Sequence, residues 1–496
     1  MRKTTLAVLL LAAIMGLAYS APAAGQELNF GDYFADRGLR FDLFQVGDAK
    51  KEAVILDHIY LEGEWPENPA GLVEPFENGR YRVRLYDIAS NRLVYSRGFD
   101  AMIGEYRTTS PASEGVRRVF KRSVRVPCPL RPFVFVIESR DRRNLPHAVF
   151  TQAIDPADYH IIRESPAAGD LVFDVLVNGP AKEKVDLVFV AEGYTAEDKD
   201  KFRADAERFT GYLFDFEPYK SLKGSFNVRG VFRPSPERAM DEPRQGRFRK
   251  TVLNASFNAF DLDRYMLIEE GHRLRELAGQ APYDAIVVLV NSNRYGGGGI
   301  YNDYCVTTVD HASSRQVFIH ELGHSFAGLA DEYYASEVSY NDFYPKGVEP
   351  LEPNITALLD PDHVKWQKYL SPGISMPTEY GKEETEALQA ERSSLLEARR
   401  KELDEAKKAG AGKSRLNAVQ SGYDKKLKDL ERKLEEVRKR YSHLADKVGV
   451  FEGAGYASKG LYRPMMYCIM ISSPKNEFCV VCQKAIERMV RYYCGR

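Results

Sequence analysis

The first third of the chain carries short stretches of strand-like hydrophobic pattern. Residues 81–86 alternate polar and apolar side chains, and residues 133–137 form a continuous apolar run. Short, turn-rich gaps separate such stretches, and this spacing is typical of a two-sheet sandwich. We therefore predict an all-β sandwich domain over residues 28–166. Its isolated histidines indicate no catalytic site there.

From residue 169 onward, apolar strands alternate with helical periodicity. Three mostly apolar stretches are predicted strands: residues 185–192, 226–232 and 283–290. Thr195, with Asp198 three residues on, predicts a capped helix after the first strand, and residues 261–277 predict a second helix. This order implies a mixed sheet with crossover helices. We predict an α+β protein whose second domain, an α/β unit, spans residues 169–496.

A sharply charged segment interrupts the second domain at residues 383–447. Glu, Lys, Arg, Leu and Ala dominate it, and its apolar residues step by three and four: Leu427, Leu430, Leu434, Val437, Tyr441 and Leu444. Glycines at 410 and 412 divide the segment into two arms. We predict an inserted helical hairpin, which is either a solvated charged spacer or an arm that docks a partner or substrate.

The N-terminal pattern predicts export. Residues 1–20 combine a positive start, an apolar run and small residues at the end, as signal peptides do. The apolar run is too short for comfortable spanning of a bilayer. We expect a periplasmic, cell-surface or secreted protein without stable membrane insertion after signal removal. The net charge of −1 over 496 residues gives no reason to expect a nucleic-acid partner.

The six cysteines are too few for a disulfide scaffold, but they fit an oxidising compartment. Four lie in the last thirty residues: Cys468, Cys479, Cys482 and Cys494. One or two bridges are therefore expected to hold the C-terminus. Cys479 and Cys482 form a C-x-x-C pair, which we interpret as structural thiols or a bridge. Redox activity or half of a zinc site are the alternatives, although no second C-x-x-C exists.

Candidate chemistry concentrates in residues 313–334, where His320, Glu321 and His324 form an H-E-x-x-H motif. Residues four apart on a helix share one face. Two neutral imidazoles at this spacing can bind one Zn²⁺, and the adjacent glutamate can take a proton from water. The motif therefore predicts a metal site.

The flanking residues support a metal helix with a third ligand beyond its end. Ser313 or Ser314 is the expected N-cap, and Gly328 the expected stop. A catalytic zinc needs a third protein ligand and an open position. Asp331 is the preferred ligand, although Gly328 and Asp331 each come one position later than in the metzincin pattern. Glu332 or a distant glutamate is the alternative.

A glycine run at residues 296–299 precedes the metal helix. It lacks the G-K-[ST] ending of a phosphate loop and does not lead into a helix. We interpret it as a flexible rim before an edge strand at residues 305–309. An extended peptide could add to such an edge, and a plain hairpin loop is the alternative.

The sequence resembles the bacterial IgA-peptidase family of zinc metallopeptidases. Five stretches carry the resemblance: residues 190–195, 298–302, 320–333, 453–456 and 462–470. It covers most of residues 169–496, and the all-β region is similar to the domain that often precedes this catalytic unit. The resemblance implies a metzincin-like fold and a zinc endopeptidase with a protein or peptide substrate. It does not imply that immunoglobulin A is cleaved.

Under this reading, His320, His324 and Asp331 hold Zn²⁺ and Glu321 is the general base. A Met-turn methionine is expected near the metal, with Met470 preferred over Met465 and Met466. Tyr462 or Tyr467 could assist. Two other functions remain open: a surface protein- or glycan-binding module with a vestigial metal site, and a cell-wall peptide amidase.

Overall fold

The computed structural model describes residues 28–163, 170–334, 343–471 and 477–496. The predicted signal peptide, residues 1–20, lies outside the described residues. The described chain forms two compact units. The first contains the described residues up to Gly328 together with residues 486–496, and the second contains the others. The domain limits drawn from the sequence remain a prediction.

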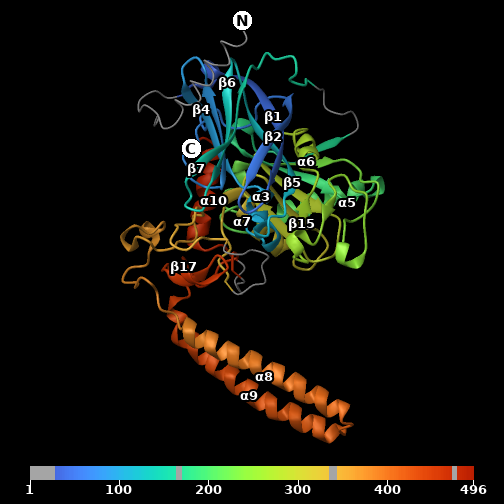
Figure 1. The fold of residues 1–496 in the computed structure, drawn as a ribbon, viewed down its shortest axis with the longest axis vertical. Coiled ribbons are helices and arrows are strands. Elements are labelled where there is room, and N and C mark those ends of the chain that lie inside the picture. The colour runs from blue at the N-terminus through green and yellow to red at the C-terminus, as the bar shows by residue number, and fades with distance from the viewer. Residues whose placement is uncertain (1–27, 164–169, 335–342, 472–476) are drawn as a thin grey trace. The chain divides into compact units, whose positions relative to one another are not determined.

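Two antiparallel sheets form the N-terminal part of the first unit (Figure 1). One has the order β2-β1-β5, with β1 (Phe34–Gly47), β2 (Glu52–Leu61) and β5 (Arg118–Pro129). The other has the order β4-β3-β6-β7, with β3 (Tyr81–Asp87), β4 (Arg92–Phe99), β6 (Phe133–Arg140) and β7 (Pro146–Ile154). Their inner faces share one apolar core, in which Phe41 stacks on Phe135 with 4.0 Å between ring centroids. The expected N-terminal all-β region is confirmed.

A six-stranded mixed sheet lies at the centre of the rest of the first unit. Its order is β14-β15-β13-β9-β10-β8. The strands are β8 (Leu171–Leu176), β9 (Val185–Glu192), β10 (Phe226–Phe232), β13 (Ala285–Val290), β14 (Gly297–Ile300) and β15 (Tyr304–Thr308). The four inner strands run parallel, and both outer strands pair antiparallel to their neighbours. Every residue of β9 is buried, as its apolar sequence implies.

Three helices accompany this sheet: α5 (Lys199–Leu213), α6 (Gly271–Ala278) and α7 (Ser314–Ala327). The helix expected over residues 261–277 is wrong in its first half. Phe260 and Asp261 adopt left-handed backbone conformations, with φ of 52° and 64°, which a helix cannot continue through. The following residues instead form β12 (Leu267–Ile268), paired with β11 (Ala255–Ser256). Among the described residues before α10, the unit also contains three short helices: α2 (Phe30–Tyr33), α3 (Met102–Tyr106) and α4 (Ser110–Ser113).

The glycine run forms the edge strand itself, which corrects the expectation of a rim before an edge strand at residues 305–309. Strand β15 lies one position in from the edge, between β14 and β13. Glycine is required because β14 lies directly against α7. A Cβ at Gly299 would clash with the carbonyl oxygen of Glu321 and lie 3.0 Å from His324 Cβ. A Cβ at Gly297 would likewise meet Val317 and the side chain of Glu321.

The second unit contains a hairpin of two long helices, α8 (Lys382–Lys408) and α9 (Lys413–Arg440), side by side in Figure 1. The buried residues of α9 step by three and four, along the seam expected from the sequence: Leu427, Leu430, Leu434 and Val437. Nearby, β16 (Phe451–Ala454) pairs with β17 (Ala457–Arg463). Trp366 is buried and its indole N–H donates to the Gly449 carbonyl at 2.8 Å. Helix α10 (Val480–Tyr493) follows.

No helix among the described residues combines the length and the apolar character needed to cross a bilayer.

The contact between β14 and α7 yields a test of stability. Gly299→Ala should lower the free energy of unfolding by about 1–3 kcal/mol, because the added methyl group meets backbone atoms that cannot move aside. The matched control is Gly211→Ala in α5, where an added Cβ meets nothing within 4 Å and helix propensity favours alanine. Thermal unfolding of both variants measures the effect. Equal midpoints for the two variants would contradict the close approach.

Candidate metal centre

Helix α7 brings His320 and His324 together. Their Nε2 atoms are 3.1 Å apart, and the rings meet edge to face with centroids 4.7 Å apart. Two nitrogens that each lie about 2.0–2.1 Å from a tetrahedral zinc are about 3.3 Å apart. Both side chains are only partly buried. The pair therefore has the separation and the access that a shared metal ion requires.

Helix α7 ends at Gly328, as the sequence predicts, but its N-terminus lacks the predicted side-chain cap. Ser313 is the N-cap residue, but its side chain makes no capping hydrogen bond, and Ser314 is already the first helical residue. Gly328 ends the helix in a left-handed conformation with φ of 61°, and its N–H donates to the His324 carbonyl at 2.9 Å. Glycine is favoured here because a Cβ is strained at positive φ. The chain therefore changes direction four residues after the second histidine.

Asp331 follows three residues later and is held by its neighbours. The Tyr456 hydroxyl donates to Asp331 Oδ2 at 2.6 Å, and the Gly455 N–H donates to the Asp331 carbonyl at 3.0 Å. Asp331 is buried. Two imidazoles and one carboxylate are a donor set that suits a catalytic zinc site.

Tyr456 was not singled out as a site residue by sequence reasoning. It lies at the turn between β16 and β17 with φ of 64°, in the Gly-Ala-Gly-Tyr stretch that carries part of the family resemblance. The family resemblance of that stretch marks Tyr456 as a candidate, but nothing in the sequence indicates which side chain the tyrosine contacts. Tyr462, by contrast, lies in β17, where its backbone exchanges hydrogen bonds with Thr356.

Glu321 lies on α7 next to His320 and is partly buried. Its carboxylate lies beside β14, because a Cβ built on Gly297 would be 3.2 Å from Glu321 Oε1. The missing side chain at Gly297 therefore leaves room for a carboxylate at this point of the helix surface.

Glu332, the alternative third ligand, belongs to a different group. It is fully buried beside Cys468, Cys479 and Cys482, and Cys482 Sγ lies 3.1 Å from Glu332 Oε1. Burial raises the pKa of Glu332, and bonds from Asn354 and Cys482 offset this only in part. Burial also raises the pKa of Cys479, but bonds with the other two thiols outweigh burial and lower it to about 6.

The bridges expected from the cysteine count are absent, since all six cysteines are free thiols. The sulfur atoms of Cys468 and Cys482 are 3.7 Å apart, well beyond the roughly 2.05 Å of a disulfide bond. Met470, the preferred Met-turn residue, is fully buried in the same region. Its carbonyl accepts a hydrogen bond from the Glu332 N–H at 2.8 Å.

The Val-Ala-Glu-Gly-Tyr-Thr stretch at residues 190–195 anchors a loop of the first unit. Glu192, at the end of β9, is fully buried and accepts hydrogen bonds from the Thr251 hydroxyl and from the N–H groups of Leu253 and Ala255. Burial raises its pKa, and these donors partly offset the shift. The glutamate thus holds the loop before β12 against the sheet.

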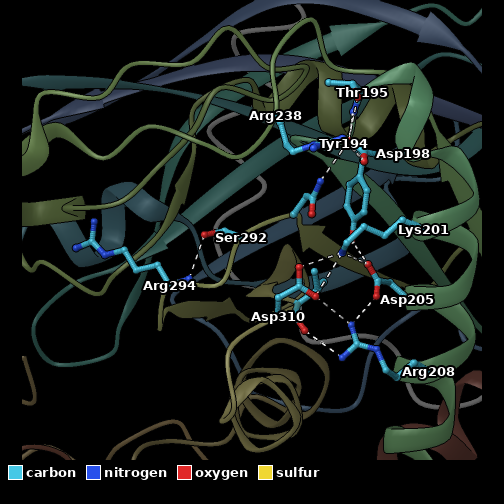
Figure 2. Close-up of polar contacts among 12 residues, drawn as sticks. Tyr194, Thr195, Asp198, Lys201, Asp205, Arg208, Arg238, Ser292, Arg294 and Asp310 are labelled. Carbon is cyan, nitrogen blue, oxygen red and sulfur yellow. Dashed lines mark hydrogen bonds and ion pairs between the residues drawn. The ribbon is translucent and has the colours of Figure 1, made fainter.

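Beyond β9, ion pairs connect α5 to the segment that leads into α7 (Figure 2). Lys201 of α5 lies 2.7 Å from Asp205 and 3.1 Å from Asp310, which comes four residues before α7. Arg208 bonds Asp205 as well and lies 3.6 Å from Asp310. Tyr194 donates to Asp205 at 2.8 Å. These contacts position the start of the helix that carries the histidines.

A second polar cluster fixes the start of α5. Asp198 accepts from the Thr195 N–H and hydroxyl at 3.0 and 2.9 Å. Arg238 binds the same carboxylate through two nitrogens, at 2.8 and 2.6 Å (Figure 2). The predicted pairing of Thr195 with an acidic residue three positions on is therefore present.

Comparison with known proteins gives two matches along the chain. Residues 173–490 match the family model described as IgA Peptidase M64, and residues 29–151 match that described as Peptidase M64 N-terminus. A search of curated proteins gives no match. Since the first match alone spans more than half of the chain, this protein belongs to the IgA peptidase M64 family, a family of metallopeptidases.

Proposed function

We propose that the protein is a zinc-dependent endopeptidase that hydrolyses peptide bonds with Glu321 as the general base. The observation that carries the proposal is the pair of histidine Nε2 atoms on α7, 3.1 Å apart, with Glu321 on the same helix. Family membership supports peptidase chemistry and a protein or peptide substrate.

His320, His324 and Asp331 would hold the zinc ion. When bound, Zn²⁺ polarises the scissile carbonyl and lowers the pKa of water, from about 15.7 toward about 7. The hydrogen bond from Tyr456 fixes the orientation of the Asp331 carboxylate. Partners of this kind keep a ligand in its binding geometry.

Glu321 would move the proton. Its carboxylate accepts a proton from the attacking water, whose oxygen bonds to the carbonyl carbon. The same group then donates that proton to the leaving amine as the C–N bond breaks. The space beside Gly297 and Gly299 allows the carboxylate to sit at the sheet edge, where the substrate backbone would lie.

Strand β14 is the element on which we place the substrate. It is the edge of the six-stranded sheet, and an extended peptide can add to such an edge through backbone hydrogen bonds. An isolated β-bridge joins Tyr265 to Gly297, so the first residue of β14 already has a backbone neighbour on the open edge of the sheet. We propose that substrate pairs with the residues that follow, 298–300. The pattern of residues 1–20 supports action outside the cytoplasm.

Removal of the base tests the mechanism. Glu321→Gln should keep the metal and lower kcat/KM by about 10²–10⁴-fold, because the amide cannot accept the proton. Glu207→Gln, on the exposed face of α5, is the matched control and should leave turnover unchanged. Cleavage of a peptide library, followed by mass spectrometry of the fragments, measures both variants. Turnover at the wild-type rate in Glu321→Gln would refute the assigned role, and a library left intact by the wild type would favour a binding module or an amidase.

Removal of a ligand tests the metal site. His320→Ala, His324→Ala and Asp331→Asn should each lose one equivalent of zinc relative to the wild type, together with all peptide hydrolysis. His160→Ala, whose side chain is exposed, is the control for histidine loss. Zinc content is measured by elemental analysis of the purified proteins. If Asp331→Asn kept both its zinc and its activity, another residue would be the third ligand.

The hydrogen bond from Tyr456 provides a milder perturbation. Tyr456→Phe should weaken zinc binding or activity by about 10–100-fold, because Asp331 loses the donor that orients it. Tyr159→Phe, at a site 84 % exposed, is the control. Competition with a chromophoric chelator measures zinc affinity. An unchanged affinity in Tyr456→Phe would show that the hydroxyl does not position the ligand.

A further inference from the structure

Three cysteines and one glutamate meet in the interior of the second unit. Cys468 precedes the last helix, Cys479 and Cys482 lie at the start of α10, and Glu332 comes from the segment after α7. All four are buried, with exposures between 0 and 4 %. One donor atom from each lies within 4.8 Å of the donor atoms of the others.

The separations match the edges of a tetrahedron around a metal. Sulfurs bound about 2.3 Å from a tetrahedral zinc are about 3.8 Å apart. Cys468 Sγ and Cys482 Sγ are 3.7 Å apart. Glu332 Oε1 lies 3.1 Å from Cys482 Sγ and 3.9 Å from Cys479 Sγ.

Backbone N–H groups donate to two of the sulfur atoms. The backbone N–H of Cys479 donates to Cys468 Sγ at 3.3 Å, and that of Cys482 donates to Cys479 Sγ at 3.5 Å. Hydrogen bonds to the charged form stabilise a thiolate. Asn354, itself fully buried, donates to Glu332 Oε1 at 3.0 Å and so holds the carboxylate in place.

One carboxylate atom indicates that a ligand belongs here. Glu332 Oε2 is buried and has no hydrogen-bond partner among the described residues. A buried acceptor without a partner is costly, and a buried carboxylate is normally paired or bound to a metal. Three thiols supply only weak donors, whereas a divalent cation would compensate the charge of the whole group.

We propose that Glu332, Cys468, Cys479 and Cys482 form a second metal site, which holds a structural Zn²⁺. Sulfur-rich tetrahedral coordination selects zinc over magnesium or calcium, and four protein ligands leave no open position for catalysis. Binding releases the thiol protons to solvent and changes no oxidation state.

The position of Glu332 gives this site a role beyond stability. It is the residue next to Asp331, so a metal that fixes Glu332 also restricts the backbone that presents Asp331. The same ion would tie that backbone to Cys479, 147 residues along the chain. The second site would thus hold one ligand of the proposed catalytic centre in place while remaining chemically separate from it.

The experiment uses the full-length protein, purified without reductant and loaded with Co²⁺ or Zn²⁺. The Co²⁺ form should show thiolate-to-metal charge-transfer absorption, which a site of two histidines and one carboxylate cannot produce. This absorption should persist in the His320→Ala/His324→Ala variant. After denaturation with a chelator, the protein should release six titratable thiols. Wild-type protein without the absorption, or with two fewer thiols because of a disulfide, would overturn the proposal.

Variants locate the ligands. Cys482→Ser and Glu332→Gln should weaken the charge-transfer absorption of the Co²⁺ form. They should also lower the zinc content by up to one equivalent. Cys494→Ser, a buried thiol outside the group, is the control and should retain both equivalents. If Cys482→Ser fails to fold, the Glu332→Gln variant and the wild-type spectrum still test whether these four residues bind a metal ion. Because the histidine variants address the other site, failure of the catalytic assignment would leave this result unaffected.

Discussion

Helix α7 and strand β14 lie so close that Gly297 and Gly299 have no room for side chains facing the helix, and the candidate catalytic site depends on this contact. The glycines of β14 remove the Cβ atoms that would meet Glu321 and His324. The strand can therefore lie at the sheet edge and against the helix at once. The consequence is that the histidines, the glutamate and an edge strand suited to an extended peptide occur in one small region.

Buried polar groups hold the segments that adjoin this region. Glu192 accepts three hydrogen bonds at the end of β9, and Asp205 joins Tyr194, Lys201 and Arg208. Buried charges are costly unless they are paired, so such clusters specify one arrangement of the loops. Here they determine where the loop before β12 lies and where the chain enters α7.

Two adjacent carboxylates serve two different groups. Asp331, the proposed third ligand of the catalytic zinc, accepts the Tyr456 hydroxyl, whereas Glu332 lies with three cysteines and Asn354. A two-residue segment thus connects the proposed catalytic zinc to the proposed structural one. This arrangement explains how a segment without helix or strand structure can present a metal ligand in a defined position, because both of its side chains are held.

The features that depend on short-range geometry could be predicted from the sequence. The spacing of His320 and His324, the helix stop at Gly328 and the apolar seam of α9 follow from the helical repeat and from the conformational freedom of glycine. The tertiary fold brings together atoms that are far apart in the chain: Tyr456 with Asp331, and Glu332 with cysteines 147 and 150 residues away. The glycine run forms a strand for the same reason, because packing against α7 outweighs the low strand propensity of glycine. No local pattern encodes such contacts, since they arise only when the chain packs on itself.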